Sequence, residues 1–277
     1  MKINTSVILC IFLLCACKPQ EDKKEIIAHK DESSITISRD HYYNQLYGFW
    51  LGQCIANWTG LVTEMDKIGN IGKIKTGDFY TRADWGKPDQ PAIWGEGKAS
   101  DLSPSIDFVF RGENEIWGAD DDTDLEYMYQ FALFKNQTSL LTAEQIKRAW
   151  IDHIYDEKKV TPYGKDNEVY QNYLWVSNQR AHELMMEGML PPHTSSPENN
   201  LHGDMIDAQL TTEIFGFFAP GHPDVALKMA ALPIRTTASG DAVYAAEFYV
   251  ILYSLAATVN TSVSVKDNLH SMLKEAR

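Results

Sequence analysis

The chain has 277 residues, of which 44% are hydrophobic, and its formal net charge is −13. This composition is typical of a globular protein that buries a core, and it excludes a disordered or fibrous chain. The negative charge repels nucleic-acid backbones and anionic lipid surfaces, and the sequence contains no basic patch that would offset it. We therefore expect no nucleic-acid partner.

The first residues resemble a secretion signal. Lys2 supplies a positive charge, and the apolar run from Val7 to Leu14 that follows is too short to span a bilayer. The run leads into Leu-Cys-Ala-Cys, which resembles a bacterial lipobox whose last cysteine, here Cys17, is lipidated after cleavage. We predict an exported protein with a lipoprotein signal peptide at 1–17, anchored to a bacterial membrane and facing the periplasm or the exterior. The alternative is an ordinary signal peptide with incidental cysteines.

Residues 18–38 are charged and lack strong periodicity, which is typical of a flexible tether between a lipid anchor and a folded body. The folded domain is predicted at 39–277. Cys10 and Cys15 would leave with the signal peptide, so Cys54 remains as a thiol on a helical pattern, where we expect it to be buried. The cysteines therefore predict neither a disulfide framework nor a thiolate metal site.

The domain begins with a helical pattern at 41–55, which predicts an amphipathic, buried helix. Gly48 and Gly52 lie four residues apart and predict a close approach to a neighbouring helix. Residues 66–117 are rich in Gly, Pro, Trp and Asp without a lasting period, which predicts a long, ordered loop region. The loop tryptophans either stack on a flat or sugar-like ligand or pin the loop to the core; they are Trp85, Trp94 and Trp117.

After Thr123 the apolar residues return at helical spacing and predict a helix that enters the core, with the preceding aspartates at its N-terminal cap. Its core residues are Leu125, Met128 and Ala132, with Tyr129 and Leu133 beside them. Further helices are predicted at 142–156, 168–188, 204–218, 222–232 and 239–258. Alternating strand patterns and tandem repeats are absent from the sequence, so the predicted fold class is all-α.

The strongest chemical signal is the segment 120–124, which contains four carboxylates in five residues. One carboxylate can cap a helix and a second can favour the positive end of the helix dipole, but this accounts for two acids and not for four. Consecutive aspartates repel each other and raise each other's pKa unless a cation compensates them. Oxygen ligands suit Mg²⁺, Ca²⁺ or Mn²⁺, so the segment predicts a divalent-cation site.

This segment and its surroundings resemble the ADP-ribosylglycohydrolase family, particularly its exported bacterial branch. The resemblance covers nearly all of the chain from about residue 40 and is carried by YGFWLGQCIANWTGLVTE (47–64), DDDTDLEYMY (120–129), GDMIDAQLTTEIFGFFAPGHPDVALKMAA (203–231) and GDAVYAAEF (240–248). It implies an all-α bundle around two adjacent Mg²⁺ or Mn²⁺ ions. It also implies hydrolysis of the bond that joins C1 of ADP-ribose to an amino-acid side chain or a related acceptor.

The resemblance also implies roles for individual residues. Asp120, Asp121, Asp122 and Thr123 match the family's first metal half-site, with Asp120 in place of the usual hydroxyl residue. Asp122 is implied as a catalytic residue through the ion that it positions, and Glu64 matches the glutamate that closes over the substrate. The implied substrate-binding residues are Asn57, Asp207, Gly240 and Asp241.

The sequence departs from the family pattern in two places. The Gly-Asp-Ala-x-Gly signature is replaced by Gly-Gln-Cys-Ile-Ala at 52–56, so its acid is missing. The family's second half-site, Asp-x-Asp-Ser/Thr on a C-terminal helix, has no match after Ser239, where Asp241 and Asp267 are isolated. We therefore expect a bundle truncated at the C-terminus, with an incomplete two-metal site, whose intact parent is the enzyme.

Two other interpretations remain open. The first is a non-catalytic sugar- or nucleotide-binding lipoprotein that keeps the cleft without the second metal. The second rests on Asp120-Asp121-x-x-Asp124, which fits the DDxxD pattern with which all-α terpene synthases hold Mg²⁺ on a diphosphate. Because the glycohydrolase resemblance is much longer than that motif, the sequence favours a metal-dependent hydrolase. Its substrate would be a small-molecule or protein-linked ADP-ribose or a related glycoside.

Overall fold

The computed structural model describes residues 34–277 apart from 68, 71, 94–101, 116–119 and 155–173. All of the helices described below lie within residues 37–277. The predicted signal peptide, Cys17 and the tether up to residue 33 lie outside the described residues.

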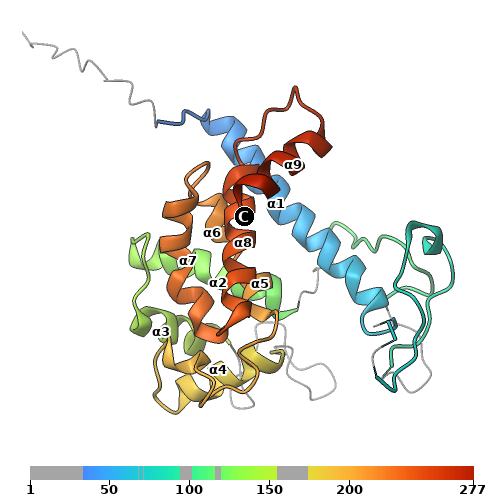
Figure 1. The fold of residues 1–277 in the computed structure, drawn as a ribbon, viewed down its shortest axis with the longest axis horizontal. Helices are drawn as coiled ribbons and strands as arrows, with labels where there is room; N and C mark the ends of the chain where they lie inside the picture. The colour runs from blue at the N-terminus through green and yellow to red at the C-terminus, as the bar shows by residue number, and fades with distance from the viewer. Residues whose placement is uncertain (1–33, 68, 71, 94–101, 116–119, 155–173) are drawn as a thin grey trace, which may run out of the picture. The chain divides into compact units, whose positions relative to one another are not determined.

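Regular structure in the described part of the chain is helical (Figure 1). The longer helices are α1 (Arg39–Gly60), α2 (Asp121–Asn136), α3 (Ala143–His153), α4 (Val176–Met186), α7 (Pro223–Thr237), α8 (Asp241–Ala256) and α9 (Val265–Glu275). The shorter ones are α5 (Asp207–Thr211) and α6 (Ile214–Phe217), with 3₁₀ turns η1 (Leu61–Thr63), η2 (Arg82–Asp84) and η3 (His193–Ser195). The β pairing found among these residues is a single bridge between Pro88 and Ser105. The predicted all-α class is therefore confirmed.

The core forms where α2 and α3 meet the C-terminal helices. Figure 1 shows α7 and α8 side by side, and α8 also packs against α5 and α6. Phe215 and Trp150 are fully buried there, and the indole N–H of Trp150 donates a 3.2 Å hydrogen bond to the Tyr129 hydroxyl. Gly216 makes the contact between α6 and α8 possible, because a Cβ at this position would collide with the Val250 carbonyl oxygen. Close helix packing thus depends on one glycine.

Helix α2 carries the acidic segment and agrees closely with its prediction. Asp120 is the N-cap residue, and its side chain accepts a 3.2 Å hydrogen bond from the Asp122 backbone N–H. The predicted inward residues Leu125, Met128, Tyr129 and Ala132 are buried, and Leu133 packs against them. The burial of this face anchors α2 in the core and leaves its N-terminal end as the part that presents carboxylates.

Helix α1 is longer than the predicted 41–55 and much less buried. Phe49 and Trp58 are its buried residues, whereas Tyr43 and Tyr47 are 66% and 60% exposed. The predicted close approach at Gly48 and Gly52 is wrong, because both are exposed and an added Cβ would meet no atom within 4 Å. The predicted burial of the Cys54 thiol is likewise only partial.

Helix α1 contacts the C-terminal half of the chain through a few specific interactions. The Tyr42 hydroxyl donates a 2.7 Å hydrogen bond to the Phe217 carbonyl, and the Gln45 amide donates a 2.9 Å bond to the Ala257 carbonyl. The Phe49 and Phe217 rings lie 4.8 Å apart between centroids. Local hydrophobic spacing could not predict these contacts, because they join residues far apart in the sequence.

Several helix bounds differ from the predictions. The segment 204–218 contains two short helices, because Thr212 leaves helical geometry between them (φ −131°, ψ 3°). The segment is buried on nearly all sides, so its apolar pattern could not mark the break. The described part of 168–188 becomes helical at Val176, the predicted 222–232 helix continues to Thr237, and α9 was not predicted.

The loop region is irregular where it is described, as predicted, apart from η2 and the single bridge. Trp85 is 46% exposed and packs edge-on against Phe108, with ring centroids 4.7 Å apart. Because Phe108 is itself 54% exposed, this tryptophan is held by another part of the loop and not by the core. The other two loop tryptophans, at 94 and 117, lie outside the described residues.

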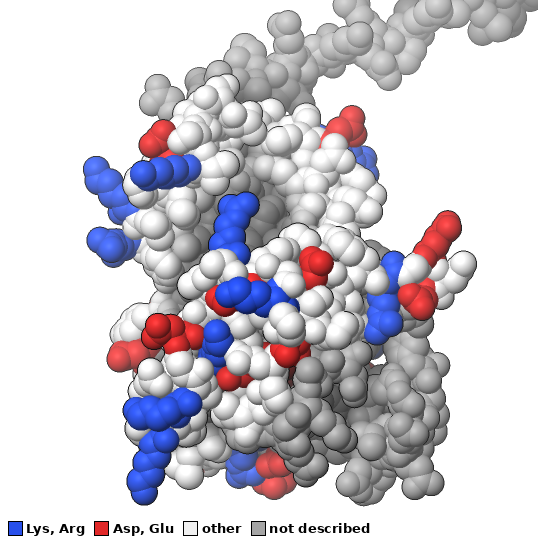
Figure 2. Space-filling view, turned by 90° about the vertical axis from the view of Figure 1, so that its right-hand side faces the viewer, with Lys and Arg blue, Asp and Glu red and all other residues white. Residues whose placement is uncertain are grey.

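Charged side chains of both signs are interspersed on the face shown in Figure 2, where no broad area of one sign is visible among the described residues. None of the helices in the described part of the chain has both the length and the apolar content needed to cross a membrane.

Candidate metal centre

A pocket with a volume of about 540 Å³ lies at the N-terminal end of α2. Its walls come from the loop after η1 and from the starts of α2, α4 and α5. The residues that line it are Leu61, Glu64, Met65, Ala92, Asp120, Asp121, Asp122, Trp175, Ile206, Asp207 and Leu210. Its volume falls within the range of roughly 300–1,000 Å³ that is usual for small-molecule sites. The walls combine apolar side chains with carboxylates, and none of these residues is a Lys, Arg or His.

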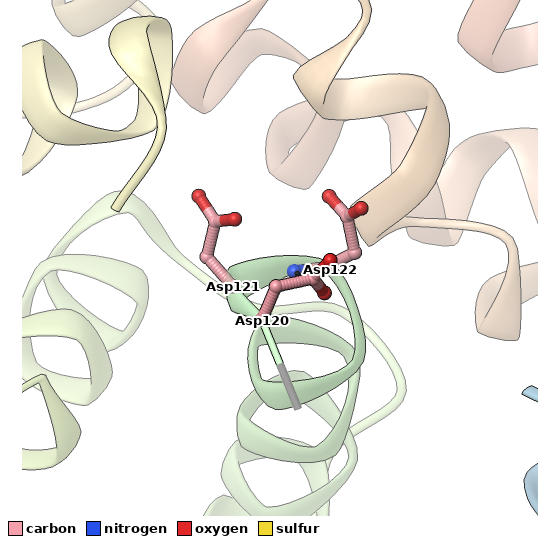
Figure 3. A group of neighbouring side chains, drawn as sticks. All are labelled: Asp120, Asp121 and Asp122. Carbon is pink, nitrogen blue, oxygen red and sulfur yellow. Dashed lines mark hydrogen bonds between the residues drawn. The ribbon is translucent and has the colours of Figure 1, made fainter. Parts of the chain in front are cut away.

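Three consecutive aspartates form the centre of this pocket. Asp120, Asp121 and Asp122 each place one carboxylate oxygen within 4.8 Å of the others. Figure 3 shows them at the end of α2, with Asp121 and Asp122 pointing in the same direction away from the helix. Asp124 does not belong to this group, which counts against the DDxxD interpretation. Among the described residues, these three aspartates are the one group of three or more Asp, Glu, His or Cys side chains close enough together to hold a metal ion.

The crowding of these carboxylates changes their protonation. Burial and, after it, the surrounding carboxylates together raise the pKa of Asp122 to about 8; these carboxylates are Asp120, Asp121, Glu213 and Asp207. Burial also raises the pKa of Asp121, although hydrogen bonds from Asn178 and Trp175 oppose that rise. A divalent cation would reverse this tendency by supplying positive charge where the carboxylates gather.

Asp121 is fixed by two donors from the start of α4. The Trp175 backbone N–H donates a 2.6 Å hydrogen bond to Asp121 Oδ2, and the Asn178 side-chain amide donates a 2.8 Å bond to the same oxygen. Asn178 is fully buried. These donors orient the carboxylate, as the outer contacts of a metal ligand generally do. Sequence reasoning missed both, because a backbone N–H carries no side-chain signal and Asn178 lies 57 residues from Asp121.

Asp207 brings a further carboxylate to the pocket wall. Its side chain is only 2% exposed, and its Oδ1 accepts a 3.3 Å hydrogen bond from the Asn178 backbone N–H. It lies near enough to Asp121 and Asp122 to raise the pKa of both. The structure therefore brings this residue, implied as substrate-binding by the resemblance, to the aspartate group.

Glu64 lies beside the group at the end of η1. The residue is exposed and lines the pocket, and partial shielding from water raises its pKa, with further increases from Asp120 and Asp121. The next residue, Met65, has a φ of 61°, a strained conformation for a residue other than glycine. Its carbonyl accepts a 2.9 Å hydrogen bond from the Ile93 N–H. This contact holds the loop that carries Glu64.

The remaining residues implied by the resemblance do not line this pocket. Thr123 is buried behind the aspartates, and Asn57 lies on α1 with its buried Oδ1 lacking a hydrogen-bond partner among the described residues. Gly240 and Asp241 line a different pocket of about 370 Å³, formed by residues near η3 and the α7–α8 junction. The structure therefore unites Glu64, the aspartate group and Asp207, and leaves Gly240 and Asp241 elsewhere.

A buried acidic pair that sequence reasoning missed lies one turn further along α2. Glu126 is 0% exposed and Glu213 is 7% exposed, and burial raises the pKa of both. Glu126 accepts a 2.8 Å hydrogen bond from the Ile214 N–H and a short one from the Gln53 amide. Gln53 occupies the position of the acid missing from the Gly-Asp-Ala-x-Gly signature. An amide there donates to Glu126, whereas an acid would add a third carboxyl group to the buried pair.

Comparison with known proteins gives one match. The sequence model of the ADP-ribosylglycohydrolase family matches residues 38–277, which is nearly the whole of the described region. No curated protein and no solved structure matches the chain. Members of the matched family are metal-dependent and act on ADP-ribosylated substrates, in agreement with the all-α fold and with an aspartate group that could bind a metal ion. The chain belongs to the ADP-ribosylglycohydrolase family.

Proposed function

We propose that this protein is a metal-dependent hydrolase that cleaves a glycosidic bond of an ADP-ribosyl or related ribosyl or glycosyl substrate. Family membership supports glycosyl hydrolysis. The observation that carries the proposal is the meeting of Asp120, Asp121 and Asp122 in a pocket large enough for a small ligand. The proposed cofactor is Mg²⁺ or Mn²⁺.

The residues of the pocket fit such a cation. Its polar side chains supply carboxylate oxygens, which hard divalent cations prefer, and no cationic side chain of the described residues lines it. The buried Asp207 Oδ2 has no hydrogen-bond partner in the described structure. A buried carboxylate oxygen without a partner is costly unless a counter-charge or a donor reaches it. A cation would satisfy the excess of acceptors.

Each wall of the pocket has a role in this account. When bound, the cation would orient the ribose hydroxyls and activate water. The donors from α4 hold Asp121 in one orientation, and the carboxylates stabilise the positive charge that develops on the sugar as the C1 bond breaks. Glu64 at the rim is placed to hold or release a proton, and partial burial together with Asp120 and Asp121 raises its pKa above the ordinary value. Leu61 and Leu210 contribute apolar surface to the walls.

We further propose that the protein acts outside the cytoplasm, attached to a bacterial membrane through a lipid on Cys17. The proposal rests on the apolar run and the Leu-Cys-Ala-Cys sequence at the start of the chain. The substrate would then be a free or protein-linked ADP-ribose, or another glycoside or nucleoside of the surroundings. Radiolabelled palmitate incorporation into the chain and into a Cys17→Ser variant tests the anchor, and equal labelling of both would contradict it.

The hydrolytic proposal is tested by the release of ADP-ribose from an ADP-ribosylated peptide with Mg²⁺ or Mn²⁺. We expect cation-dependent release, abolished by EDTA and reduced at least 100-fold by the paired Asp121→Asn and Asp122→Asn substitutions. Asp224→Asn is the control, because it removes one charge from a side chain that is 73% exposed at the start of α7. Cation-dependent binding of ADP-ribose without release would favour the binding-protein alternative and contradict hydrolysis.

A further inference from the structure

One carboxylate oxygen of Asp207 accepts a hydrogen bond, and the other has no hydrogen-bond partner among the described residues. Its Oδ1 accepts from the Asn178 N–H, whereas its buried Oδ2 has no hydrogen-bond partner in the described structure. The residue is 98% buried at the wall of the aspartate pocket. A buried charged group is normally paired or hydrogen-bonded, and one left unsatisfied is generally compensated by a ligand, a water molecule or an ion.

One residue fixes Asp207 and the aspartate group relative to each other. The Asn178 backbone N–H donates to Asp207 Oδ1, and its side-chain amide donates to Asp121 Oδ2 at 2.8 Å. Asn178 is fully buried, so these two bonds do not compete with bulk water. The two carboxylates are therefore held near each other by a common support, despite the repulsion between them.

The charges around Asp207 indicate which kind of group compensates its unpaired oxygen. None of the described residues that line the pocket is cationic, so none of them supplies a compensating positive charge. A substrate hydroxyl would satisfy one acceptor but would bring no positive charge to offset the crowding of Asp121, Asp122 and Asp207. A cation satisfies both requirements.

We propose that Asp207 is a fourth carboxylate of the cation site, acting from outside the inner group of Asp120, Asp121 and Asp122. Its oxygens are not among those that lie within 4.8 Å of one another, so it would reach the cation through an intervening water. Mg²⁺ usually keeps several waters when protein carboxylates bind it, which leaves room for such an outer acceptor. The inference rests on the proposed function of this pocket and assigns Asp207 a positioning role towards the cation.

The test is a calorimetric titration of Mn²⁺ and Mg²⁺ alone into the full chain and into Asp207→Asn. The variant retains an oxygen that can accept from the Asn178 N–H, but it removes the charge. We expect cation affinity to fall by about 10- to 100-fold, the usual loss when an outer contact of a metal site is removed. Asp204→Asn, which removes a charge from an exposed position three residues earlier, is expected to leave the affinity unchanged.

A second variant keeps the test decisive if Asp207→Asn does not fold, as judged by circular dichroism. Asp207→Ser is also neutral and keeps a small polar side chain at this position, so the same loss of cation affinity is expected. If a folded variant bound the cation as tightly as the wild type, the proposed role of Asp207 would be overturned and the proposed function would stand. Loss of ADP-ribose binding alone, at unchanged cation affinity, would overturn it too. Absence of cation binding by the wild type would overturn both.

Discussion

The Asn178 side-chain amide donates a 2.8 Å hydrogen bond to Asp121 Oδ2, which links the start of α4 to the first turn of α2. Both residues are buried, and the bond joins two helices between which α3 lies in the sequence. The orientation of a carboxylate proposed to bind the cation therefore depends on a neutral side chain from another helix.

Replacing Asn178 with Ala should weaken cation binding by about 10- to 100-fold, because Asp121 loses the donor that orients it. The free energy of unfolding should also fall by about 1.5–3 kcal/mol, the usual contribution of a hydrogen bond to a charged group. Metal titration and thermal unfolding in EDTA measure the two effects separately. Gln179→Ala, at the exposed neighbouring position, serves as the control. Unchanged cation affinity in a folded Asn178→Ala protein would argue against this orienting role.

The Glu126–Glu213 pair should make the metal-free protein less stable as pH rises. Folding raises the pKa of Glu213 above its ordinary value of 4.5, through burial first and then through Glu126. From about pH 4.5 up to that raised pKa the folded state therefore binds more protons than the unfolded state, and the free energy of unfolding falls with increasing pH. Each unit of the rise costs about 1.4 kcal/mol once both states are deprotonated.

Glu213→Gln should remove this pH-dependent loss and supply an amide that donates to Glu126, as Gln53 already does. We expect the variant to gain stability over the wild type as the pH is raised from 5 to 9, measured by denaturant unfolding in EDTA. Glu187→Gln, at an exposed position, should show no such trend. A stability difference between Glu213→Gln and wild type that stays constant across this pH range would contradict the account of the pair.

Two glycine substitutions should have opposite effects. Gly216→Ala should destabilise the protein by about 1–3 kcal/mol, because the new Cβ would collide with the Val250 carbonyl where α6 meets α8. Gly48→Ala should instead stabilise it by roughly 0.5–1 kcal/mol, since this position on α1 is open and alanine favours a helix. Denaturant unfolding of both variants measures these changes. A destabilising Gly48→Ala would show that this face of α1 is covered.

Glu64→Gln should reduce hydrolysis of an ADP-ribosylated peptide by about 10²- to 10⁴-fold, the usual contribution of a group that transfers a proton. Cation affinity should change little, because Glu64 lies at the rim and outside the aspartate group. Glu113→Gln, on an exposed part of the loop region, is the control. An unchanged rate would remove Glu64 from the mechanism, and a large loss of cation affinity would make it a ligand instead.

The sequence predicted the elements whose spacing is regular. Helix α2 was recognised because its inward residues recur at helical intervals and because Asp120 is a favourable N-cap residue. Helix α1 was recognised as a helix but assigned too much burial, since spacing shows which residues share a face and not whether another helix covers it. The break between α5 and α6 was missed, because a segment buried on nearly all sides has no polar face to mark it.

The candidate site was predictable where its residues are consecutive and not where folding brings them together. Asp120, Asp121 and Asp122 were found from their local charge density, which has few structural explanations. Glu64 and Asp207 came from the family resemblance. Asn178 and the Glu126–Glu213 pair were missed, because a single Asn or Glu in a helix carries no signal of its long-range partner.

The central claim is that the aspartate group is a cation site that serves ligand binding. Its most direct test is calorimetric titration of Mg²⁺ and Mn²⁺, with and without ADP-ribose, into the wild type and into a protein carrying Asp121→Asn and Asp122→Asn. The account predicts that the wild type binds the cation and binds ADP-ribose only in its presence, and that the substituted protein, although folded, does neither. A folded wild-type protein that binds no divalent cation at millimolar concentration would reduce the segment to a helix cap and contradict the account.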